Sequence, residues 1–185
     1  MEEQLDILNE KGKKTGKSDT YKNAHLRGLI HLAVHIWFLN SKGQLLLQKR
    51  SKSRAAYPNL WDLSVGGHVS AGQSSLEAAQ RETQEELGVL LPYGDFKYLF
   101  TLKQHVILNQ STYINNEFND IYLVHSDLEI SELKLQAEEV EEARWIDIKD
   151  LEKWVKGEGE KLVSHEEEYK KLFEYLDKNS YKYKA

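Results

Sequence analysis

The chain has 185 residues, of which 40% are hydrophobic and 30% charged, and this composition fits a single globular domain with a sizeable core. The formal net charge of −5 excludes the broad basic surface that nucleic-acid-binding proteins use, so we expect a small-molecule partner. The absence of cysteine excludes disulfides, thiolate metal sites and cysteine nucleophiles.

The N-terminal segment is acidic and has no long apolar run, which predicts neither a signal peptide nor a membrane span. We therefore expect a cytoplasmic protein. Residues 4–20 contain a short apolar stretch, a turn rich in lysine and glycine, and a return stretch, and they predict a hairpin. Residues 29–40 predict a buried strand, which the turn at 40–43 joins to a second strand at 44–50 as a simple hairpin.

A local basic cluster precedes a pair of glycines. Lys49, Arg50, Lys52 and Arg54 stand within six residues in an otherwise acidic chain, and planar guanidinium groups suit phosphate oxygens. Arg50 and Arg54 are therefore candidate phosphate contacts. Apolar and polar residues then alternate over 61–65, which predicts a short strand that leads into a glycine loop.

The segment GHVSAGQSSLEAAQRETQEELGV, residues 67–89, predicts a helix with defined ends. Ser74 and Glu77 have the spacing of a capping box, and Gly88 stands where a left-handed residue ends a helix. Leu76, Ala79, Thr83 and Leu87 form an apolar stripe.

Three acids share one face of this predicted helix. Glu82, Glu85 and Glu86 stand at i, i+3 and i+4, so their carboxylates project together, on a face that we expect to be exposed. Hard oxygen ligands at this spacing suit Mg²⁺ or Mn²⁺, which take carboxylates together with phosphate oxygens and water. Arg81 is placed to pair with Glu85 one turn away.

The rest of the chain continues the alternation of strands and helices. We expect a turn at 91–94, strands at 96–108, 121–127 and 140–148, a loop over 110–120, and helices at 147–155 and 165–180. The last helix has Tyr169, Leu172, Phe173 and Leu176 on one face, and its charged residues are expected to face solvent. No internal repeat or linker divides the chain.

Residues 67–89 resemble the Nudix box, whose pattern is GX5EX7REUXEEXGU with U a bulky aliphatic residue. Gly67, Arg81, Glu82, Glu85, Glu86, Gly88 and Val89 match the pattern. Gln73 replaces the first glutamate and Thr83 an aliphatic residue. The resemblance implies an α/β Nudix fold, an α/β/α sandwich with a mixed central sheet, in one domain: a lead-in at 1–28, a core at 29–155 and a C-terminal helix at 156–185.

Residues 20 to 155 also resemble the type I isopentenyl-diphosphate isomerase branch of this superfamily. That resemblance implies metal binding by His25, His31 and His68, diphosphate contacts by Arg50 and Arg54, and a catalytic role for Glu117 at the start of a strand. The isomerase uses a cysteine where this chain has Gly66, while the set of Arg81, Glu82, Glu85 and Glu86 is complete. The comparison favours an isomerase-like hydrolase and leaves a second metal site open, because a strand histidine such as His35 is more often packed than metal-bound.

The resemblance implies a reaction in which Glu82, Glu85 and Glu86, with the Gly66 carbonyl, hold Mg²⁺ or Mn²⁺ while water cleaves a diphosphate linkage. Arg81 and Glu117 join the catalytic set, and Arg50, Arg54, Gly67 and His68 contact the substrate. Glu82 is the first choice as general base, with Glu117, Glu138 and Glu139 as alternatives. An isomerase and a non-catalytic diphosphate-binding module are the competing functions, and the substrate and a homodimeric assembly stay open.

Overall fold

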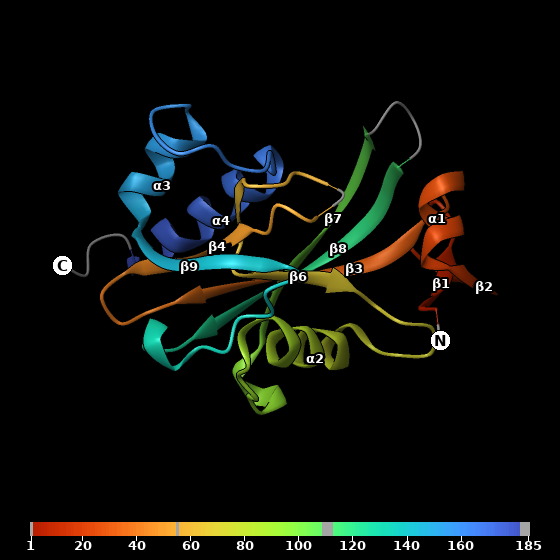
Figure 1. Ribbon diagram of the computed structural model, residues 1–185, viewed down its shortest axis with the longest axis horizontal. Coiled ribbons are helices and arrows are strands. Elements are labelled where there is room, and N and C mark those ends of the chain that lie inside the picture. The colour runs from red at the N-terminus through yellow and green to blue at the C-terminus, as the bar shows by residue number, and fades with distance from the viewer. Residues whose placement is uncertain (1, 55, 109–112, 182–185) are drawn as a thin grey trace.

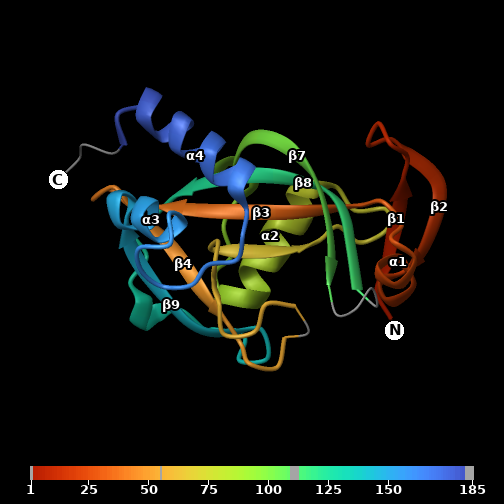
Figure 2. The same ribbon diagram turned by 90° about the horizontal axis from the view of Figure 1, so that it is seen from above.

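The computed structural model describes residues 2–54, 56–108 and 113–181. A mixed seven-stranded sheet lies between α2 (Ser75–Leu87) on one face and α3 (Ile148–Val155) with α4 (Glu166–Lys178) on the other, as Figures 1 and 2 show. The predicted α/β/α sandwich with a mixed central sheet is confirmed. None of the helices in the described part of the chain is long and apolar enough to cross a membrane.

The central strand is β3 (His31–Leu39), which runs parallel to β8 (Tyr113–His125) and antiparallel to β6 (Val65–His68). The remaining strands extend the sheet outward: β7 (Lys97–Leu108) pairs with β8, and β4 (Gln44–Arg50) pairs with β5 (Trp61–Asp62) and β9 (Val140–Asp147). This register places Gly66 beside His35, and Glu117 beside His31. The middle of the sheet therefore gathers the histidines that the sequence singles out.

The predicted hairpin of β3 and β4 is only partly present. The two strands pair antiparallel at Leu39 and Leu45, after which β4 runs along β9 while β3 runs along β6 and β8. Both strands are buried over most of their length, so each takes partners on both of its edges.

The predicted loop over 110–120 is wrong, because β8 begins at Tyr113; residues 109–112 lie outside the described part of the chain. The polar stretch forms a strand because its backbone pairs with β3 on one edge and with β7 on the other, and some of its side chains also find partners. Asn116 Nδ2 donates to the Gly28 carbonyl at 2.9 Å, and Asn119 Nδ2 donates to Gln104 Oε1 at 3.2 Å. Glu117 consequently lies within β8 and does not open it.

The predicted N-terminal hairpin is confirmed as β1 (Gln4–Leu8) and β2 (Lys14–Thr20), which form a separate two-stranded sheet. The sequence analysis missed the next element, α1 (Tyr21–Arg27), which Thr20 caps and Gly28 ends in a left-handed conformation with φ of 62°. β1 also contacts the segment before α2, because the Ala71 N–H donates to the Gln4 carbonyl at 2.7 Å. This contact joins the N-terminus to the box segment.

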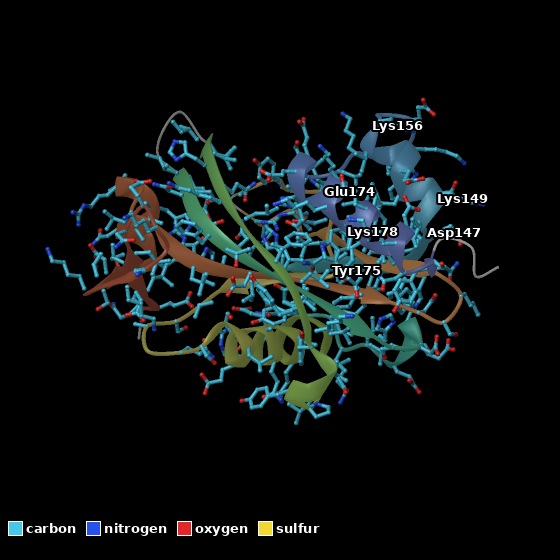
Figure 3. The ribbon with its side chains drawn as sticks, turned by 180° about the vertical axis from the view of Figure 1, so that it is seen from behind. Asp147, Lys149, Lys156, Glu174, Tyr175 and Lys178 are labelled. Carbon is cyan, nitrogen blue, oxygen red and sulfur yellow. The ribbon has the colours of Figure 1, made fainter. Side chains whose placement is uncertain are left out.

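Alternate residues of β3 supply the two hydrophobic cores, as the period of a strand requires. Val34, Ile36 and Phe38 pack towards α2, while Trp37 and Leu39 pack towards α3 and α4. The predicted apolar stripe of α4 is confirmed, with Tyr169, Leu172 and Leu176 buried and Phe173 partly buried. Figure 3 shows Glu174, Tyr175 and Lys178 on α4, Lys149 on α3 and Lys156 at the end of α3, on the side of the molecule opposite α1.

Candidate active site and comparison with known proteins

The box helix has the ends that its sequence predicts. The Ser74 side chain accepts from the Glu77 N–H at 3.3 Å, and the Glu77 carboxylate accepts from the Ser74 N–H at 2.8 Å, so the capping box is complete. Gly88 ends α2 with a φ of 74°. Thr83 donates its hydroxyl to the Ala79 carbonyl at 2.7 Å, which satisfies a polar group on the packing face.

The box acids are more buried than the sequence predicts. Glu82 and Glu86 are 9% and 2% exposed, and only Glu85 is half exposed. The expected exposed position of Glu86 is wrong, because Gln48 of the neighbouring sheet donates to its carboxylate at 3.0 Å. Glu82 and Glu86 therefore point towards the sheet, whereas Glu85 stays partly in solvent.

Gly66 and Gly67 lie within β6, so the expected glycine loop before the box is a strand. A Cβ at position 67 would lie 2.0 Å from Cδ of Glu82, far inside van der Waals contact. Glycine is needed here because the carboxylate packs directly on the strand backbone.

Arg81 connects the acids to the segment before α2. Its Nη1 lies 2.8 Å from both Glu82 Oε1 and Glu85 Oε2, and its Nη2 donates to the His68 carbonyl at 2.8 Å. Nη2 also donates to Gln73 Oε1 at 3.4 Å, while the same oxygen accepts from the Ser70 N–H at 3.3 Å. Gln73 therefore orders this segment through its amide although it lacks the charge of the family glutamate.

Burial shapes the electrostatics of the box. Desolvation raises the pKa of Glu82 to about 7, in spite of the adjacent Arg81, and the charge of Glu85 adds to the rise. Desolvation also raises the pKa of Glu86 well above its ordinary value, and the charge of Glu82 reinforces it. The positive charge near the buried carboxylates of Glu82 and Glu86 is thus too small to balance both of them. A divalent cation would supply the missing charge.

A cavity of about 450 Å³ opens in front of these acids, and its lining includes Arg54, Gly66, His68, Arg81 and Glu82. Arg54 pairs with Glu139 at 2.5 Å and is one-quarter exposed. Arg50 lies deeper: it donates to the Ala56 carbonyl and to Asp62, each at 3.0 Å. Of the two predicted phosphate contacts, Arg54 faces the box cavity and Arg50 is held in a buried ion pair.

The structure brings the three predicted histidines together around Glu117. His31 Nε2, His68 Nε2 and His25 Nε2 lie 3.2, 3.3 and 3.6 Å from Glu117 Oε1. Burial acts to raise the pKa of Glu117, but hydrogen bonds from the imidazoles hold it well below its usual range. Among the described residues the buried His25 Nε2 has no hydrogen-bond partner, because its 3.6 Å separation from Glu117 Oε1 is too long for one, so the donor set fits a cation.

A second buried network joins β3 to the C-terminal helix, and the sequence analysis missed it. His35 Nδ1 lies 2.7 Å from Glu168 Oε2, and His165 Nε2 lies 2.9 Å from Asp62 Oδ1. The expectation that the charged residues of the last helix face solvent is wrong for Glu168, which is 3% exposed. A signal was present, because Glu168 stands four residues before Leu172 and so shares the apolar stripe.

Comparison with known proteins identifies the family. The family model described as the NUDIX domain matches residues 29–166. Nudix hydrolase 3 of Arabidopsis thaliana is 40% identical over 95% of this chain, which spans 23% of that relative's length. The Nudix hydrolase lmo0368 of Listeria monocytogenes is 37% identical over 81% of this chain and 83% of its own.

An isopentenyl-diphosphate Delta-isomerase of Escherichia coli is 32% identical over 80% of this chain and 79% of its own length. Among solved structures, DR0079 of Deinococcus radiodurans has a TM-score of 0.67 at 24% identity and covers 95% of this chain and 98% of its own, which shows a shared fold. The chain therefore belongs to the NUDIX family, as a Nudix hydrolase close to the isopentenyl-diphosphate isomerase branch.

Proposed function

We propose that the chain hydrolyses a diphosphate linkage in a nucleoside diphosphate derivative or a similar small molecule, with Mg²⁺ or Mn²⁺ bound by Glu82, Glu85 and Glu86. The carrying observation is that Glu82 packs against Gly67 and, with Glu85, lines a cavity of about 450 Å³, while Glu86 lies on the same face of α2. The buried, under-neutralised carboxylates fit a hard dication, and the Gly66 carbonyl is a further candidate ligand. When bound, the cation supplies charge neutralisation and a more acidic water.

The surrounding residues have separate roles in this proposal. Arg81 holds Glu82 and Glu85 in place, and Arg54 offsets phosphate charge at the mouth of the cavity. Glu82 receives the proton of the attacking water, because its carboxylate lines the cavity beside the proposed cation. Glu117 is engaged by three imidazoles, Glu139 by Arg54, and Glu138 is exposed, which makes each a weaker candidate for the base.

The two competing functions, an isomerase and a non-catalytic binding module, differ from a hydrolase in what they release. The 32% identity to an isopentenyl-diphosphate isomerase and the arrangement of His25, His31, His68 and Glu117 favour an isomerase, whereas Gly66 replaces its cysteine. We propose that this histidine cluster holds a second cation beside the hydrolytic site. A binding module without catalysis would retain a diphosphate ligand and release no phosphate.

The test is a panel of nucleoside diphosphates, nucleoside triphosphates, sugar nucleotides and isoprenoid diphosphates, each with Mg²⁺ or Mn²⁺, followed by product analysis. We expect hydrolysis of at least one compound and a loss of about 100-fold or more in kcat for Glu86→Gln. Glu86→Gln keeps the shape that Gln48 binds, so the variant should stay folded. Interconversion of isoprenoid isomers without hydrolysis, or an unchanged rate for Glu86→Gln, would refute the assignment.

A further inference from the structure

Three potential metal ligands meet where the C-terminal helix docks on the sheet. His35 comes from β3, His165 precedes α4, and Glu168 lies in its first turn. One ligand atom from each residue lies within 4.8 Å of the other two. We propose that His35, His165 and Glu168 form a binding site for a transition-metal dication such as Zn²⁺, separate from the box acids and from the cluster around Glu117.

The measured separations need little adjustment to accept an ion. Metal–nitrogen and metal–oxygen bonds of about 2.1 Å place neighbouring ligand atoms roughly 3.0 Å apart at right angles and about 3.4 Å apart in a tetrahedron. His35 Nδ1 and Glu168 Oε2 are already 2.7 Å apart. All three ligand atoms lie within 4.8 Å of one another, so the longest separation must shorten by at most about 1.4 Å to reach the tetrahedral value.

Neighbouring side chains hydrogen-bond to the candidate ligands, as the neighbours of metal ligands do. Trp37 Nε1 donates to Glu168 Oε1 at 2.8 Å and leaves Oε2 on the side of His35. His165 shares Nε2 with Asp62, so that its neutral form keeps a lone pair on Nδ1. Arg50 in turn binds Asp62 at 3.0 Å. Such outer partners fix the orientation and basicity of ligands.

The donor atoms of the network suit a transition metal. The carboxylates of Asp62 and Glu168, the imidazoles of His35 and His165 and the Arg50 guanidinium meet within it. Two nitrogen ligands and one carboxylate suit Zn²⁺, Co²⁺ or Fe²⁺ better than Mg²⁺, which prefers oxygen ligands.

The proposed site is accessible to small molecules. A cavity of about 220 Å³ is lined by His165 and Glu168, and a second cavity of about 80 Å³ is lined by His35 and His165 together with His68 and Glu117. Three protein ligands leave a coordination position for water or for an oxygen of a bound molecule. The ion would join β3 to α4. It would also line the cavity of about 80 Å³ that His35 and His165 share with His68 and Glu117.

The test is a Co²⁺ titration of the full chain, followed by visible absorption with excess Mg²⁺ present to occupy the carboxylate sites. His31→Ala together with Glu117→Gln leaves only His25 and His68 of the cluster around Glu117, so the remaining Co²⁺ signal reports the proposed site. We expect one bound Co²⁺ in this background, and an affinity at least about 10-fold lower after adding Glu168→Gln or His165→Gln. A Zn²⁺-dependent rise in Tm that both changes abolish is the second readout.

Two matched controls separate ligands from their neighbours. Glu167→Gln alters an exposed acid beside Glu168, and His105→Gln removes an exposed histidine of β7; neither should change Co²⁺ binding. If circular dichroism shows that Glu168→Gln does not fold, the Co²⁺ affinity of His165→Gln decides the test, because His165 lies ahead of the helix. Absence of Co²⁺ binding in the His31→Ala, Glu117→Gln background, or binding that His165→Gln leaves unchanged, overturns the proposal and makes the network a purely structural anchor of α4.

Discussion

At Gly67, one added carbon atom would displace the carboxylate of Glu82 in the box helix. Gly67→Ala places a methyl carbon 2.0 Å from Cδ of Glu82, and the flexible carboxylate must move away while β6 keeps its pairing. We expect a loss of about 100-fold in metal-dependent turnover with a small change in Tm. Calorimetric Mn²⁺ binding checks the cause, and Gly94→Ala, which meets no atom within 4 Å, is the control. Normal Mn²⁺ affinity in Gly67→Ala would contradict this account.

Glu82 makes the stability of the metal-free protein depend on pH. Its folded pKa of about 7 lies above its ordinary value of 4.5, so its contribution is fully present below 4.5 and is lost as pH rises through 7. A difference of this size corresponds to about 3 kcal/mol of unfolding free energy. We expect urea unfolding in a chelator to show lower stability at pH 8 than at pH 5. Glu82→Gln should flatten that part of the curve, and an unflattened curve would assign the effect to other groups.

At the scale of elements, the docking of α4 depends on one buried carboxylate. Glu168→Ala leaves His35 and the Trp37 N–H buried without their acceptor, and breaking a buried pair in this way costs about 3 kcal/mol. Urea unfolding without added metal measures the loss. Glu167→Ala on the solvent side should stay within about 0.5 kcal/mol of the parent chain. Equal effects of the two changes would show that Glu168 is not an anchor.

Elements whose signals are local could be predicted from the sequence. The ends of α2 follow from Ser74, Glu77 and Gly88, because a capping box and a left-handed glycine act within a few residues. The apolar stripe of α4 follows from its periodicity. The position of β8 could not be predicted, because its polar residues form a strand through pairing with β3, which lies far away in the chain, and with β7.

In the candidate active site, too, some features could be predicted from the local sequence and others depend on distant residues. The shared face of Glu82, Glu85 and Glu86 follows from helix geometry, but their burial depends on Gln48 and Gly67, which come from other elements. The meeting of His35 with Glu168 spans 133 positions of the chain, and no local pattern carries that information. The division of residues 1–185 into lead-in, core and C-terminal helix stays a prediction.

At the scale of the whole molecule, the N-terminal hairpin contacts the segment that precedes the box helix. The Ala71 N–H donates to the Gln4 carbonyl at 2.7 Å, and the Gly72 N–H donates to Asp6 at 3.0 Å. A chain without residues 1–20 should therefore exchange these two amide protons faster, while amides of β3 stay protected. Hydrogen exchange followed by NMR measures both. Unchanged exchange at Ala71 and Gly72 would show that the hairpin does not order this segment.

The segment matched by the family model begins at residue 29 and ends at residue 166, yet the fold uses side chains on both sides of it. Glu3 accepts from the Ser70 hydroxyl at 2.9 Å at one boundary, and Glu168 holds His35 at the other. An expression product trimmed to the matched segment would omit both acids. When the rates of such trimmed products are compared with those of intact relatives, the effect of losing Glu3 and Glu168 would therefore be mistaken for a difference in catalytic chemistry.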